Sequence, residues 1–112
     1  MNTSVTDAIT EYVAAVRAAH GADNIVVEAE AGRKFVKIIV SRTEHYGAHR
    51  HVHAFVNKET GSLYKPAGWK GPVQDERYNL LTEMGMVKRV IDAYGTYLYA
   101  DTASRLRKLC AG

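Results

Sequence analysis

The spacing of hydrophobic residues near the start of the chain predicts a helix. From residue 4 to residue 20, hydrophobic side chains recur every three or four positions, which places them on one face of an amphipathic helix. These positions are Val5, Ile9, Tyr12, Val13, Val16 and His20. Gly21 follows the last of them, and glycine readily adopts the left-handed conformation that ends a helix. We therefore expect a helix over residues 4–20.

After residue 23 the hydrophobic period shortens to two, which is typical of strands. The predicted strands cover residues 24–30, 33–42, 50–56 and 62–65. Short links and turns separate them, and such links favour antiparallel neighbours. The pattern predicts an α+β fold, in which the N-terminal helix packs on a four-stranded antiparallel meander. A single domain is expected to take in residues 1–112.

Residues 66–81 are predicted to form a loop, because two prolines and two glycines within seven residues exclude a helix or a central strand. Trp69 lies among them. Tryptophan buries a large area, so the expected role of Trp69 is an anchor that holds the loop against the domain. The alternative is an exposed stacking platform with Lys65 and Lys70 beside it.

Helical spacing returns after this loop and predicts a C-terminal helical segment. The hydrophobic positions are Leu80, Met84, Val87, Ile91, Tyr94 and Leu98. Gly85 and Gly95 weaken a continuous helix here. A short basic helix is expected over residues 102–109.

The two central strands predict two different sheet faces. One face is aliphatic and should pack on the helix; it carries Val36, Ile38, Val40, Val52, Ala54 and Val56. The other face mixes aromatic, basic and aliphatic side chains; it carries Phe35, Lys37, Ile39, His49, His51, His53 and Phe55. Small monomers rarely expose such a patch. We expect a second copy of the chain or the C-terminal segment to cover it, and ligand binding is the alternative.

Composition and charge narrow the classes of protein. The chain has 112 residues, of which 46% are hydrophobic and 24% charged, as in a globular domain. Hydrophobic runs fall short of the roughly 20 residues of a membrane helix, the N-terminus does not resemble a signal peptide, and the single cysteine excludes an internal disulfide. We therefore expect a cytoplasmic protein without a membrane partner.

Charge is unevenly distributed along the chain. Residues 1–31 hold five acids and one base, a charge of −4, and the rest hold fourteen bases and seven acids, a charge of +7. A basic C-terminal part is able to face an anion such as nucleic acid.

The histidines at positions 49, 51 and 53 are the sharpest candidate for metal chemistry. On a regular strand they share a face, and imidazoles suit Zn²⁺, Ni²⁺ or Cu²⁺. Three such ligands span about 13 Å, which is too far to bind one ion. The sequence also lacks a nucleophile elbow and a phosphate loop. We expect no metal, no cofactor and no enzymatic activity; a small metal-dependent enzyme that uses His49, His51 and His53 is the least favoured alternative.

One stretch carries a distinctive pattern. Thr60-Gly61 forms a turn, a Tyr-Lys-x-Ala-x-Trp-Lys-x-Pro loop runs from Tyr64 to Pro72, and an Arg-x-Asn sequence follows from Arg77 to Asn79. This pattern resembles a group of small bacteriophage-encoded proteins of unassigned function. The resemblance implies a phage origin and a role in the cytoplasm of an infected bacterium. It carries over no catalytic residue.

The leading hypothesis is a non-enzymatic phage accessory protein that forms a homo-oligomer and binds a host or phage protein or another macromolecule. The alternative is a nucleic-acid-binding module that uses the aromatic and basic sheet face. The candidate binding residues are Lys37, His51, His53, Phe55, Lys65, Trp69, Lys70 and Arg77.

Overall fold

The computed structural model of the protein describes residues 3–21, 23–44, 47–93 and 95–99. The elements in chain order are α1 (Thr3–His20), β1 (Ile25–Ala31), β2 (Phe35–Glu44), β3 (Gly47–Asn57), β4 (Ser62–Tyr64), β5 (Tyr78–Asn79), α2 (Met84–Val90) and α3 (Thr96–Tyr99). The predicted α+β class and the N-terminal helix are confirmed. The basic helix predicted over residues 102–109 lies outside the described residues.

The strands form one antiparallel meander in the order β1-β2-β3-β4-β5. The sequence predicted four strands, and the fifth comes from a segment that was predicted to be a loop. Tyr78 pairs with Leu63, and Asn79 pairs with Ser62. A strand of two residues is too short to show a period of two, which is why the hydrophobic pattern did not reveal it.

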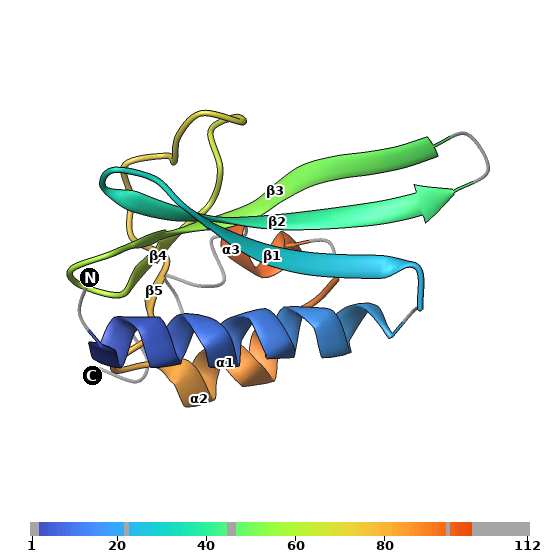
Figure 1. Ribbon diagram of the computed structural model, residues 1–112. Helices are drawn as coiled ribbons and strands as arrows, with labels where there is room; N and C mark the ends of the chain where they lie inside the picture. Colours follow the sequence, from blue (N-terminus) through green and yellow to red (C-terminus); the bar gives the residue numbers. More distant parts are fainter. Residues whose placement is uncertain (1–2, 22, 45–46, 94, 100–112) are drawn as a thin grey trace.

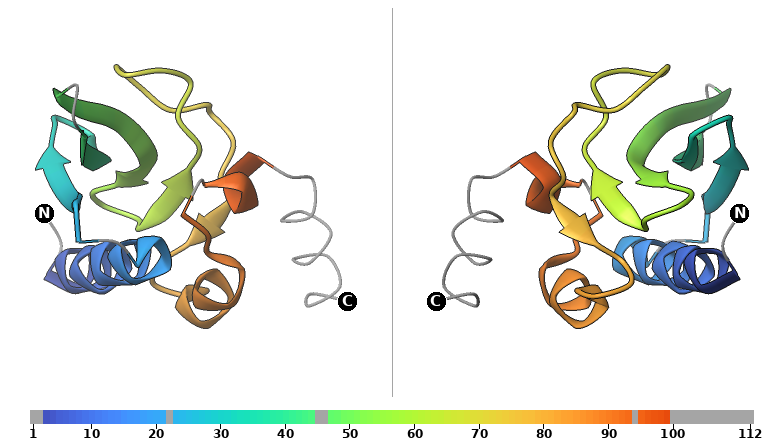
Figure 2. Two further views of the ribbon diagram at one scale, coloured as in Figure 1. Left: turned by 90° about the vertical axis from the view of Figure 1, so that its right-hand side faces the viewer. Right: turned by 90° about the vertical axis from the view of Figure 1, so that its left-hand side faces the viewer.

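The core lies between the sheet and the helices. The buried face of α1 carries Val5, Ile9, Tyr12 and Val16, and it packs on aliphatic side chains of β2, β3 and β4. Figures 1 and 2 show α1 and α2 side by side on this face of the sheet. An ion pair between Lys88 of α2 and Glu11 of α1 joins the two helices.

The C-terminal segment is not one continuous helix. The backbone leaves the helical conformation at Ile91, which has φ −56° and ψ 136°. Gly95 then adopts φ 75° before α3 begins. The hydrophobic spacing in the sequence continues across this break because residues on both sides of it, such as Val87 and Leu98, are buried in the same core.

A β-bulge in β3 reverses the faces that the sequence predicted for half of that strand. Ile38 pairs with Ala54, but the next residue, Ile39, pairs with Val52, so His53 is the extra residue. Because side chains alternate, one extra residue moves every residue beyond it to the opposite face. The prediction that Val52 lies on the core face and His51 on the other face is therefore wrong.

The chain itself covers much of the second sheet face. Residues 65–72 rise on the side of the sheet away from α1 and α2 (Figures 1 and 2). On this face Ile39 is 0% exposed and Phe55 is 3% exposed. The expected exposed patch of Phe35, Ile39 and Phe55 is thus mostly absent from the single chain.

Among the residues that the structure describes, no helix is both long enough and apolar enough to cross a membrane.

Candidate functional site

The loop that presents Trp69 is closed by backbone contacts. Pro66 and Pro72 form an isolated antiparallel bridge. The amide of Ala67 donates to the carbonyl of Gly71 over 3.0 Å, and the amide of Val73 donates to the carbonyl of Lys65 over 3.0 Å. These contacts hold the loop as a small hairpin, so its shape does not depend on burying the tryptophan ring.

Two cations of the sheet support the Trp69 ring. The Lys37 Nζ atom lies 4.5 Å from the ring centroid, and the Arg50 Cζ atom lies 5.3 Å from it. Both distances allow cation–π attraction. The tryptophan remains 44% exposed. The burial expected of an anchor is therefore not observed: the ring lies against charged side chains of the sheet, and nearly half of the residue stays exposed.

Sequence reasoning missed Arg50, because on a regular strand this residue would share the face of Val52, which was predicted to pack on the helix. The bulge at His53 moves Arg50 to the outer face, where it is opposite Ser41 of β2. The sequence carries no signal for a bulge at this position.

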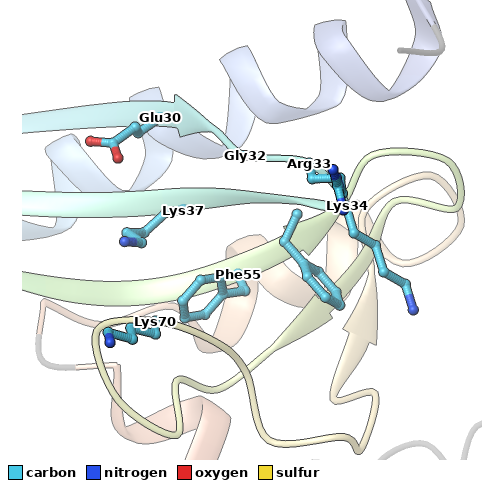
Figure 3. A pocket seen from close by; sticks show the side chains of 8 residues that line it. Glu30, Gly32, Arg33, Lys34, Lys37, Phe55 and Lys70 are labelled. Carbon is cyan, nitrogen blue, oxygen red and sulfur yellow. The ribbon is translucent and has the colours of Figure 1, made fainter.

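A cleft of about 280 Å³ lies beside the Trp69 loop (Figure 3). We call it the basic cleft; it is lined by Glu30, Gly32, Arg33, Lys34, Phe35, Lys37, Phe55 and Lys70. Four cations and one carboxylate line it, so its electrostatic potential favours an anion. Lys37 belongs to the basic cleft and also contacts Trp69, which makes the two features parts of one site.

Aromatic side chains form the apolar part of the basic cleft. The Phe35 ring meets Phe55 edge to face at 6.2 Å between centroids, and it meets Tyr64 in the same way at 5.6 Å. The Lys34 Nζ atom lies 5.5 Å from the Phe35 ring centroid. Phe35 is partly exposed, whereas Phe55 is buried beneath the site. Of the two phenylalanines, Phe35 is the one that a ligand is able to touch.

The structure brings together half of the predicted binding residues. Lys37, Phe55, Trp69 and Lys70 all belong to the site. Lys65 lies at the base of the Trp69 loop. Arg77 follows that loop and forms an ion pair with Asp75 at 3.5 Å, but it does not line the cleft.

His53 and His51 lie away from this site. The His53 Nε2 atom is 2.7 Å from the Tyr97 hydroxyl, which in turn is 2.5 Å from the Tyr12 hydroxyl. These hydrogen bonds link β3 to α3 and α1 in the core. Burial, with smaller effects of His51 and His20, lowers the pKa of His53 to about 4. His53 is therefore a neutral core residue, and its assignment to the binding face is wrong.

His51 faces the end of α1. It is opposite the buried residue Val40, and the pKa of His51 is lowered by burial and by the nearby Arg42. His20 has a pKa lowered by burial, then by His51 and Arg42. In the described part of the chain, no three His, Cys, Asp or Glu side chains are grouped so that they could hold a metal ion.

Part of the distinctive sequence pattern has a structural role. The Asn79 side chain donates to the carbonyl of Thr60 over 3.0 Å and accepts from the amide of Leu81 over 2.8 Å. Gly61 has φ 76°, a conformation that favours glycine. The Thr60-Gly61 turn and Asn79 thus build the β3–β4–β5 region, while Trp69 and Lys70 of the same pattern remain exposed.

Comparison with curated proteins and with solved structures finds no match. A family model described as a family of unknown function, DUF7717, matches residues 2–100. This match covers most of the chain, including every element of the fold and the whole candidate site. The protein therefore belongs to the DUF7717 family.

Proposed function

We propose that this protein is a non-enzymatic binding protein whose ligand is single-stranded nucleic acid. The observation that carries the proposal is a half-exposed tryptophan, supported by Lys37 and Arg50, beside a cleft with four cations. An aromatic ring is able to stack on any base, and the cations around it neutralise phosphates.

Single strands suit this site better than a duplex does. In a duplex the flat faces of the bases are stacked on one another, so Trp69 has no free base to stack on. A single strand offers unstacked bases, and recognition of this kind commonly uses aromatic side chains on a sheet. Trp69 at the tip of a raised loop and Phe35 in the basic cleft supply two such surfaces.

A role without catalysis is supported by the positions of the titratable groups. His53 and Tyr97, whose pKa values are strongly shifted by burial, lie in the core and not in the basic cleft. A catalytic acid or base must reach its substrate.

We also propose a phage origin and a role in the cytoplasm of an infected bacterium. The support is the sequence pattern around Trp69 and Lys70, which resembles that of small phage-encoded proteins. A host or phage protein is the alternative partner, and the binding experiment below tests it.

The proposal is tested with labelled single-stranded DNA and RNA by fluorescence anisotropy. Because Trp69 is the one tryptophan of the chain, its intrinsic fluorescence should be quenched when a base stacks on it. Affinity should fall steeply as salt rises, because bound cations on the nucleic acid are released. Trp69→Ala should weaken binding by about tenfold or more, the cost of losing one base stack.

Two variants provide matched controls. Leu81 is exposed to about the same extent as Trp69, at 43%, so Leu81→Ala removes a comparable side chain outside the site. Lys37→Glu should abolish binding at moderate salt, while Arg89→Glu, at an exposed position of α2, makes the same change of charge elsewhere. No binding to either nucleic acid at low salt would overturn the proposal and favour a protein partner. Equal losses of affinity in the site variants and in the control variants would do the same.

A further inference from the structure

A single carboxylate lines the otherwise cationic basic cleft. Glu30 of β1 is the direct cross-strand neighbour of Lys37 in β2. Opposite charges at such positions commonly pair, but the Lys37 Nζ atom lies over the Trp69 ring instead. Glu30 has no hydrogen bond or ion pair to another residue that the structure describes. Its carboxylate is therefore available to a ligand.

Glu30 lies where both the phosphate and the base of a bound nucleotide would be near its carboxylate. Figure 3 shows Glu30, Lys37 and Lys70 pointing the same way from β1, β2 and the Trp69 loop. A base stacked near Phe35 would have its edge toward this row of side chains. Lys37 then stands between the cleft and Trp69, where the phosphate that joins two successive nucleotides would lie.

A carboxylate accepts hydrogen bonds and repels other acceptors. Cytosine presents the N4 amino group as a donor, and a carboxylate is a known partner for it. Thymine and uracil present the O4 acceptor at the corresponding position. One carboxylate at the base edge therefore distinguishes two pyrimidines of nearly equal size.

We infer that Glu30 makes the basic cleft selective for bases that carry an amino group, so that cytosine is bound in preference to thymine or uracil. This inference rests on the proposed binding of single-stranded nucleic acid. It assigns Glu30 a role in specificity, whereas Lys37, Arg50 and Trp69 supply affinity that does not depend on sequence.

Glu30 could instead act only by electrostatic repulsion, and this simpler role predicts a different change of affinity when the carboxylate is removed. If its carboxylate only repels phosphates, removing the charge strengthens binding to every sequence by the same factor. If it accepts a hydrogen bond from the base, removing it weakens binding to cytosine and relieves the repulsion of thymine. The ratio of the two affinities separates these cases, since a general electrostatic effect cancels in it.

The experiment measures the affinity of the full chain for oligo-dC and oligo-dT of equal length by anisotropy. A slightly alkaline buffer keeps the cytosine strands unpaired. We expect the wild-type protein to prefer oligo-dC by about fivefold, the effect of one favourable hydrogen bond. Glu30→Ala should remove this preference. Glu28→Ala is the matched control, because Glu28 lies two residues earlier on the same face of β1 and outside the cleft; it should keep the preference.

The outcomes separate this inference from the proposed function. Equal affinity of the wild-type protein for both oligonucleotides overturns the inference and leaves the proposed function intact. So does a Glu30→Ala variant that binds both more tightly with an unchanged ratio. Failure to bind these oligonucleotides and single-stranded RNA at low salt overturns the proposed function itself.

Discussion

His53 illustrates how one residue acquires a structural role through burial. Its imidazole is 2% exposed and is hydrogen-bonded to Tyr97. The Tyr97 hydroxyl also contacts the Tyr12 hydroxyl, so one buried polar chain joins a strand and two helices. Burial raises the pKa of both tyrosines, which keeps the hydroxyl groups neutral. These hydrogen bonds satisfy the His53 Nε2 atom and both hydroxyl groups, which would otherwise be costly to bury. The other ring nitrogen of His53, Nδ1, is buried without a hydrogen-bond partner among the described residues.

The lowered pKa of His53 predicts acid sensitivity. Its pKa falls from 6.5 to about 4 on folding, so the unfolded chain binds a proton more readily than the folded protein. The contribution to stability is fully present above pH 6.5 and declines as the pH falls toward 4. The full loss amounts to about 3 kcal/mol. Urea denaturation between about pH 7 and pH 4.5 measures it.

A His53→Gln variant isolates this effect from the titration of carboxylates. Glutamine does not titrate, so the variant should lose stability less steeply with falling pH than the wild-type protein does. Its overall stability is expected to be lower, but the slope is the informative quantity. Equal slopes in the two proteins would show that His53 does not bind a proton on unfolding.

At the scale of the elements, the hydrophobic pattern correctly predicted those helices and strands that are regular and bury one face. It identified α1, because Val5, Ile9, Tyr12 and Val16 all enter the core. It failed where geometry departs from regularity. The bulge at His53 reversed the faces of His51 and Val52, and this kind of irregularity leaves no mark in a pattern of alternating residues.

The candidate site was only partly predictable for a related reason. Lys37, Trp69 and Lys70 were recognised as an aromatic and basic combination. Glu30, Arg33 and Lys34 were not, because they enter the site only when the Trp69 loop folds back beside the β1–β2 turn. That fold depends on contacts between segments far apart in sequence, and no local pattern encodes it.

Two glycines in different turns, Gly61 between β3 and β4 and Gly68 in the Trp69 loop, allow a test of backbone strain. A Cβ atom at Gly61 would lie 2.9 Å from Leu81 Cγ, and the backbone there has φ 76°. Gly61→Ala should therefore destabilise the protein by about 1–2 kcal/mol. At Gly68 a Cβ atom would meet nothing within 4 Å. Gly68→Ala should leave stability within about 0.5 kcal/mol. Thermal or urea unfolding measures both, and equal effects would contradict the difference between the two turns.

At the scale of the whole molecule, the sheet has one face covered by helices and the other partly covered by the chain's own loop. α1 and α2 lie on the first face, and the Trp69 loop lies on the second (Figure 2). The loop leaves open a basic surface that includes Trp69 and Lys70. The second face therefore combines internal packing with a surface suited to an anion.

This arrangement removes the reason to expect a homodimer through the second face. Ile39 and Phe55 are already buried in the single chain, and the cations around the basic cleft would repel those of a second copy. We expect light scattering at micromolar concentration to give a mass near 12.4 kDa. Phe55→Glu should unfold or aggregate the protein, because it places a charge in the packed interior. A mass of twice that value for the wild-type protein, with Phe55→Glu giving a folded monomer, would show instead that Phe55 lies in an interface between two copies.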